Sequence, residues 1–369
     1  MNVKKKYVLL ALVTVVSLSA CNNQTDAVNQ GADAAMGNAN SAIAFPETYT
    51  MTDGNVKYNL SLEMPEDIDV NNFREVDVCS ILYNDTPAAL EYLCKDKAIN
   101  ETQVIPADEF TPEEYSYYFD DGSRLSAGGS TLTCDSPNSE YYRDVFYRIS
   151  NDTDLLQDEP PDFSFAAPSD CLQEIEDIMK ATGYDTTVSA SVFSLTAEQA
   201  KAWEEHLTID GDRQEEAYKE EWTEEDNAYI ISAYQTYNGV PVFNEMLAMN
   251  QEMAVDSPDN APIQAICTAR GLESLMVIAQ YEFSETKEEV SFLPFEMITK
   301  TISTKLNNIL SESPYEVYKA KLFLMVRYVT ARDYEAFPVW YFEAREEGSD
   351  EKMVLIVDAV TGEEINIGQ

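Results

Sequence analysis

One order of elements occurs twice in the C-terminal half of this 369-residue chain. Pro294 opens a predicted helix, and three strand-like segments follow it: KAKLFLMVRYV, FPVWYFEAR and KMVLIVDAVTGEEI. Residues 167–257 repeat this order, with a helix that Ser169 caps and Gly183 ends, and then strands. Each predicted helix carries one apolar face: Leu172, Ile175, Ile178 and Met179 in the first, and Phe295, Ile298, Ile302, Leu306 and Ile309 in the second. Such faces must be buried against a sheet, which predicts an α+β fold.

Turn signals divide the rest of the chain. Asp53-Gly54 and Asn238-Gly239 each lie between alternating segments, which predicts β-hairpins. Residues 46–160 are predicted to form a strand-rich N-terminal domain, which ends near Pro160-Pro161. A C-terminal region, 161–369, is predicted to hold two α+β units, at about 165–260 and 290–369. The segment GLESLMVIAQYEF is predicted to form a strand between these units.

Local helix signals are also present. Thr86 followed by Pro87 predicts a helix start, and Thr111 with Glu114 forms a similar capping pattern. Thr196 with Gln199 predicts a capping box before AKAWEEHL. The stretch GDRQEEAYKEEWTEED is interpreted as a charged, partly helical connection.

The N-terminus has the pattern of a secretory signal peptide. Lys4, Lys5 and Lys6 precede an apolar run from Tyr7 to Ala20, which is too short to span a membrane. The sequence LSAC at its end resembles the lipobox of bacterial lipoproteins. The resemblance implies that residues 1–21 are a signal peptide and that Cys21 is the lipid attachment residue, carrying acyl chains such as palmitate. The alternative is an ordinary secreted protein.

A polar segment follows Cys21. Residues 22–45 are predicted to be a flexible tether, because they hold too little apolar surface to fold. The chain as a whole has a formal net charge of −43. That charge argues against nucleic acid as a partner, since phosphate backbones attract clustered Lys and Arg. The sequence therefore indicates a protein attached to the membrane through Cys21, on the outer face of the cytoplasmic membrane.

Five further cysteines leave the disulfide pattern open. They are Cys79, Cys94, Cys134, Cys171 and Cys267. An odd number leaves at least one thiol unpaired or paired between chains. Cys79 with Cys94 or Cys134 is one possible disulfide, and burial as a small apolar side chain is the default for each.

Two stretches of the C-terminal half resemble known modules. AYQTYNGVPVF resembles a strand pair of PepSY-like and protease-propeptide modules, and FPVWYFEAR with VLIVDAVTGEEI resembles their ending. The order is similar to that of YycI-type regulators, which are extracytoplasmic partners of a histidine kinase, and the layout resembles uncharacterised lipoproteins of Gram-positive bacteria. The resemblance covers roughly 165–369. It implies two PepSY-like or cystatin-like units, each a helix with an antiparallel sheet, whose curved sheets contact other proteins.

No motif assigns a catalytic, cofactor-binding or metal-binding residue. His206, the single histidine, lies among glutamates typical of a solvated helix face. Asp210–Glu221 approximates a calcium loop, but Glu215 stands where the sharp turn needs glycine. Pairs of carboxylates are too numerous among 67 acids to single out one.

The sequence therefore predicts a non-enzymatic, lipid-anchored protein that binds or regulates another envelope protein, with no cofactor. One alternative is a surface lipoprotein that binds a peptide or glycan, which a deep aromatic-lined pocket would favour. A carboxylate-based hydrolase is the other, which two cleft acids with raised pKa would favour.

Overall fold

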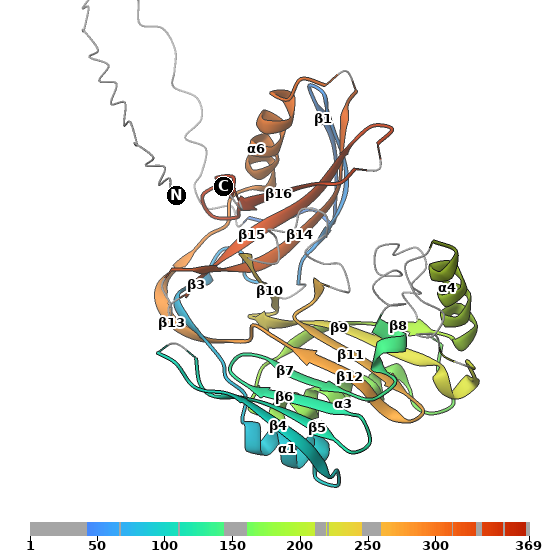
Figure 1. Cartoon of the computed structure of the whole chain (residues 1–369). Helices are drawn as coiled ribbons and strands as arrows, with labels where there is room; N and C mark the ends of the chain where they lie inside the picture. Colours follow the sequence, from blue (N-terminus) through green and yellow to red (C-terminus); the bar gives the residue numbers. More distant parts are fainter. Residues whose placement is uncertain are drawn as a thin grey trace, which may run out of the picture. The chain divides into compact units, whose positions relative to one another are not determined.

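The folded structure begins inside the expected tether. The computed structural model describes residues 43–65, 68–109, 111–143, 161–210, 219, 221–245, 260–311, 313–329, 334–349 and 351–366 (Figure 1). Ile43 and Phe45 pack against a hydrophobic core, and the centroid of the Phe45 ring lies 5.3 Å from that of Trp340. The signal peptide, Cys21 and the remainder of the tether lie outside the described residues.

The first sheet is built around two long antiparallel strands, β14 (Tyr315–Tyr328) and β15 (Tyr334–Glu346). On the free edge of β14, β2 and then β10 run parallel to it. On the free edge of β15, β3 and β16 pair with different parts of the strand. β1 pairs with β2, and β13 pairs with β3. The bounds are β1 (Thr48–Asp53), β2 (Val56–Glu63), β3 (Phe73–Ile81), β10 (Val240–Asn244), β13 (Tyr281–Val290) and β16 (Met353–Asp358).

Helix α6 (Phe295–Asn307) covers one face of this sheet (Figure 1). Four residues of its predicted apolar face, Phe295, Ile298, Ile302 and Leu306, are each at most 2% exposed. The fifth, Ile309, lies beyond the end of the helix and is 37% exposed. The Tyr58 hydroxyl donates to the Thr299 carbonyl at 2.8 Å, which satisfies a polar group inside the core. Burial of each large apolar side chain contributes roughly 2 kcal/mol, so this helix–sheet contact is a main source of stability.

The second sheet is antiparallel, in the order β8-β9-β11-β12-β7-β6-β5-β4. α1 and α3 contribute to the hydrophobic core of this sheet. The strands are β4 (Ile99–Ile105), β5 (Glu114–Phe119), β6 (Arg124–Gly128), β7 (Leu132–Asp135), β8 (Val188–Leu195), β9 (Ala228–Tyr237), β11 (Ile263–Thr268) and β12 (Gly271–Val277). The helices are α1 (Thr86–Cys94), α3 (Pro168–Ala181), α4 (Ala197–Asp210) and the short η3 (Glu224–Asp226).

A tight hairpin connects the two sheets. β9 of the second sheet turns through Asn238-Gly239 into β10, which joins β14 of the first. Both turn residues have positive φ, 49° and 80°, as the predicted hairpin requires. The Asp53-Gly54 hairpin is likewise formed, with Asp53 opposite Val56.

Most local predictions are confirmed. The chain is sheet-rich with few helices, as expected of an α+β protein. The three helices predicted near Ser169, Thr196 and Pro294 all form, and Thr196 and Gln199 make their capping box. Ser169 is not the cap of its helix, because α3 already begins at Pro168 and Ala167 is the N-cap. The helix predicted at Thr86 forms one residue away from the expected cap, because Asp85 caps it by accepting from Ala88.

Two local predictions are wrong. The capping pattern at Thr111 starts no helix, because its Glu114 begins β5, where Tyr115 and Tyr117 pair with neighbouring strands. GLESLMVIAQYEF forms two strands, β12 and β13, with Ala279 at a positive φ of 50° between them. The segment that follows the Asn238-Gly239 turn forms β10 as far as Asn244, and residues 246–259 lie outside the described part.

Strand pairing crosses the expected boundary near residue 160. β2 and β3, from residues 46–160, pair with β14 and β15. β7, from the same range, pairs with β12. Both sheets therefore combine strands from either side of that boundary. No helix among the described residues has the length and apolar character needed to cross a membrane.

Candidate functional site

Most residues singled out in the sequence lie outside the described part of the chain, or have no described side chain. Cys21 lies outside the described residues. His206 belongs to α4, but its side chain is not described. In the calcium-loop candidate, residues 211–218 and 220 lie outside the described residues. The structure therefore does not test these candidates.

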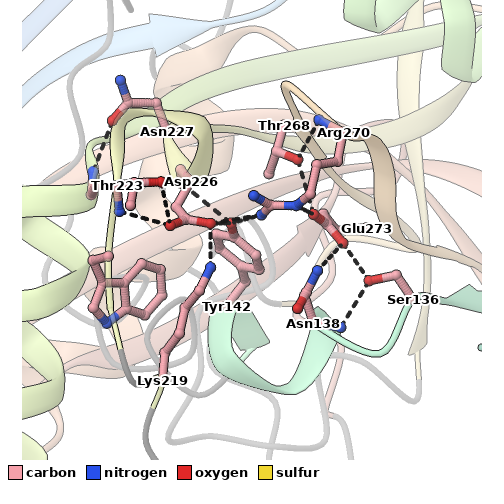
Figure 2. Close-up of polar contacts among 12 residues, drawn as sticks. Ser136, Asn138, Tyr142, Lys219, Thr223, Asp226, Asn227, Thr268, Arg270 and Glu273 are labelled. Atoms are coloured by element: carbon pink, nitrogen blue, oxygen red, sulfur yellow. Dashed lines mark hydrogen bonds and ion pairs between the residues drawn. The ribbon is translucent and has the colours of Figure 1, made fainter. Parts of the chain in front are cut away.

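A buried cluster of charged side chains lies beside the second sheet (Figure 2). At its centre is Asp226, whose side chain is 2% exposed. One carboxylate oxygen, Oδ2, accepts from the Thr223 N–H at 2.8 Å and from its hydroxyl at 3.2 Å, which caps η3. The other oxygen, Oδ1, pairs with Lys219 and lies 2.8 Å from Arg270. Every oxygen of this buried acid is therefore satisfied.

Arg270 joins Asp226 to a second buried acid. Its Nε donates to Glu273 at 2.8 Å, and its Nη2 donates to the Tyr142 hydroxyl at 2.8 Å. Glu273 also accepts from the Thr268 hydroxyl at 2.9 Å and from the Ser136 hydroxyl. The short β11–β12 turn thus presents an arginine flanked by two carboxylates (Figure 2).

Neighbouring groups shift the pKa of Asp226 and of Arg270. Burial alone would raise the pKa of Asp226, but donors from Lys219, the Thr223 backbone and Arg270 lower that pKa to about 2. Burial likewise disfavours charge on Arg270, yet the neighbouring Tyr142, Asp226 and Glu273 hold its pKa above the usual value. Lys219 and Arg270 balance the charges of Asp226 and Glu273.

Three chain segments meet at this cluster. Ser136 and Tyr142 follow β7, Asp226 ends η3, and Arg270 lies in the β11–β12 turn. Their hydrogen bonds join residues up to 137 positions apart. The carboxylates already have hydrogen-bond donors within the protein. We therefore interpret the cluster as structural, because its hydrogen bonds hold these three segments together. In the sequence, Thr223 followed three residues later by an acid was a visible cap signal, whereas the partners Tyr142 and Glu273 had none.

In the described part of the chain, the carboxyl groups with a clearly shifted pKa are shifted downward, not upward as a general acid needs. Hydrogen bonds to Asn72 hold the pKa of Asp69 below its usual value, and hydrogen bonds from Ser123 lower that of Asp121 to about 2. A general acid near neutral pH needs a raised pKa. Within the described ranges, no group of three His, Cys, Asp or Glu side chains is placed to hold a metal ion.

The last strand of the second sheet is exposed along its whole length. All seven residues of β4 are exposed, including Ile99 at 48%, Val104 at 46% and Ile105 at 63%. In the described part of the chain, β4 pairs through one edge, with β5. Val104 lies opposite Tyr115, whose ring stacks on that of Tyr117 at 5.9 Å between centroids. We call Ile99–Ile105 with Tyr115 and Tyr117 the β4 surface.

An open depression lies between α6 and the turn after β16. It has a volume of about 640 Å³, and its lining includes Met297, Lys300 and Lys305. Lys305 forms an ion pair with Glu364 at its rim. No aromatic side chain lines this depression, so it does not have the character expected of a glycan or peptide cleft.

Comparison with solved structures shows a shared fold. The chain is similar to an uncharacterized protein from Eubacterium rectale ATCC 33656, with a TM-score of 0.60 and 13% sequence identity. The alignment covers 87% of this chain and 94% of that one. At this identity the likeness concerns the fold.

More distant neighbours are also found. The Bacillus megaterium YpeB C-terminal domain aligns at 10% identity over 80% of this chain and 97% of its own, with a TM-score of 0.29. YycH from Bacillus subtilis aligns at 10% identity over 84% and 99%, with a TM-score of 0.17. Neither similarity is high enough to carry an inference. No family model and no curated protein matches the chain.

Proposed function

We propose that this protein is a non-enzymatic lipoprotein that binds another protein of the cell envelope through the β4 surface. Cys21 carries the lipid anchor and holds the protein on the outer face of the cytoplasmic membrane. The C-terminal region supplies two PepSY-like α+β units. The lipobox-like LSAC and the NGVPV and PVW segments support these assignments, as does the recurring order of a helix followed by strands.

The exposed β4 edge is the observation that carries the proposal. A strand with an unpaired edge offers a row of backbone donors and acceptors to an incoming strand. Proteins normally protect such edges with short strands, bulges or charged side chains. β4 has seven residues and one acid, its pairing with β5 shifts register only between Ile99 and Glu101, and it exposes three large apolar side chains. We therefore expect the partner to add an extended segment to β4, with apolar side chains against Val104 and Ile105.

The β4 surface is also firmly attached to the core. Its neighbour β5 places Phe119, which is 3% exposed, in the core of the second sheet, and the next strand, β6, places Leu125 there. Lys97, two residues before β4, donates to Ser123 at 2.7 Å. A rigid edge binds with less loss of conformational entropy than a mobile one.

Copurification from membranes solubilised in mild detergent tests this proposal. Val104→Lys with Ile105→Lys adds two charges to the proposed contact, while Met297→Lys places one at an exposed site on α6 as a control. We expect an envelope protein that copurifies with the unmodified chain and the control, and is lost with the β4 variant. Equal recovery with all three forms would exclude the β4 surface as the contact.

The lipid anchor is tested separately. Cys21→Ala is expected to abolish incorporation of labelled palmitate and to release the protein from the membrane fraction, because the thiol is the proposed acylation site. A Cys79→Ala variant is the control, since that thiol is buried in the first core. Labelling that persists in Cys21→Ala would contradict the assignment.

A further inference from the structure

We propose that four of the cysteines are two disulfide-forming pairs, Cys94 with Cys134 and Cys171 with Cys267, and that Cys79 remains a thiol. Each disulfide would fasten one helix to the second sheet. This inference goes beyond the binding role and does not depend on it.

The first pair joins α1 to β7. Cys94 is the last residue of α1, and Cys134 lies in the middle of β7. The two thiols are hydrogen-bonded to each other, which places the two side chains next to one another. Cys94 is 4% exposed and Cys134 is partly exposed, and both belong to the core of the second sheet.

The second pair repeats the arrangement with α3 and β11. Cys171 lies in the first turn of α3, and Cys267 lies in β11 at a bulge after Ile266. Their thiols are also hydrogen-bonded to each other, and both are nearly fully buried. β7 and β11 flank β12, so both strand cysteines lie in the centre of the same sheet.

The fifth cysteine lies in the other core. Cys79 is in β3, opposite Phe283 and Tyr334, and is fully buried among residues of the first sheet. Burial raises the pKa of its thiol to about 12, which suppresses the reactive thiolate. The disulfides considered from the sequence, between Cys79 and Cys94 or Cys134, are therefore not those that the fold brings together.

The hydrogen bond within each pair shifts the pKa of both thiols. The bond from Cys134 lowers the pKa of Cys94, and the corresponding bond raises the pKa of Cys134. The same direction holds for Cys171 against Cys267.

Oxidation needs an external disulfide, such as oxidised glutathione. The thiolate of one cysteine of the pair attacks one sulfur of that disulfide and expels the other as a thiolate, which takes up a proton. The other cysteine of the pair then loses its proton and attacks the protein sulfur of this mixed disulfide, which expels the second glutathione thiolate. The protein gains one disulfide for each external disulfide reduced to two thiols.

Accessibility sets the order of oxidation in the folded protein. Attack on an external disulfide needs an exposed sulfur, and Cys134 is the most exposed of the four. We therefore expect the Cys94–Cys134 pair to oxidise first, and the Cys171–Cys267 pair to oxidise faster during folding than after it.

Peptide mapping after equilibration with glutathione tests the proposal. The reduced full chain, both folded and during refolding, is incubated with mixed oxidised and reduced glutathione. Remaining thiols are alkylated, and a non-reducing digest is analysed by mass spectrometry. We expect linked peptides 94–134 and 171–267, with Cys79 alkylated only after denaturation. Five alkylated cysteines after both treatments, or a linkage through Cys79, would overturn the proposal.

Single variants sharpen the result. Cys134→Ala should leave Cys94 alkylatable while the 171–267 linkage persists, and Cys79→Ala should keep both linkages. The oxidised protein should melt on the order of 10 °C above the reduced form. Under reducing conditions the Cys134→Ala variant should melt close to the unmodified chain, which separates loss of the disulfide from loss of packing. An equal melting temperature of the oxidised and reduced forms would contradict the stabilising role.

Discussion

At the scale of single residues, the buried acids are held by several donors each. Asp226 and Glu273 share Arg270, and Glu343 in β15 accepts from the hydroxyls of Tyr318 at 2.8 Å and Tyr341 at 3.0 Å. A buried carboxylate without such partners would be strongly destabilising. In a chain with a net charge of −43, these residues show how individual acids are accommodated inside the fold.

Removal of the shared cation should destabilise the fold. Arg270→Met leaves Glu273 buried without its ion pair, so we expect a loss of about 3 kcal/mol in the free energy of unfolding. Arg143→Met is the matched control, because Arg143 is 55% exposed where it pairs with Asp135, and exposed ion pairs contribute at most about 1 kcal/mol. Urea denaturation measures both. If Arg270→Met lowers the free energy of unfolding no more than the control does, the proposed structural role of the cluster is contradicted.

Acid should weaken the same cluster. The pKa of Asp226 is lowered to about 2 in the folded protein, from about 3.9 in an unfolded chain. Its contribution is therefore complete above about pH 4 and is lost as pH falls towards 2; it amounts to about 2 kcal/mol. We expect the stability difference between the unmodified chain and Asp226→Asn to shrink over that range. A difference that stays constant with pH would contradict the low pKa.

At the scale of elements, glycines at turns and close approaches fix the strands. Gly128 ends β6 with a φ of 111°, and a Cβ there would lie 2.7 Å from the Glu114 Cα. Gly348, between β15 and β16, has a similar φ of 88° but no heavy atom within 4 Å of such a Cβ. The two positions share the backbone requirement for glycine but differ in the space around it.

This pair separates conformational cost from steric clash. Gly348→Ala should cost roughly 1 kcal/mol, the penalty for a left-handed backbone. Gly128→Ala should cost more, roughly 3 kcal/mol, because the added methyl group meets the backbone of β5. Thermal or urea unfolding gives both values. Equal losses would show that β5 and β6 can separate to admit the methyl group.

At the scale of the whole molecule, local patterns predicted the elements better than their partners. Asp53-Gly54 and the face of Ile298 and Ile302 depend on neighbouring residues, and both were readable in the sequence. The parallel pairing of β2 with β14 joins segments more than 250 residues apart and depends on a complementary surface that no local pattern encodes. The contact between Tyr142 and Asp226 could not be predicted from the sequence for the same reason.

Photo-crosslinking in intact cells tests the central claim most directly. A photoreactive residue replaces Ile105 on the β4 surface or, as a control, Met297 on α6; both native side chains are more than half exposed. We expect a single envelope protein to be crosslinked from position 105, not from 297, and the product to disappear when Cys21→Ala removes the anchor. Identical crosslinking patterns from both positions, or none from position 105, would contradict binding at the β4 surface.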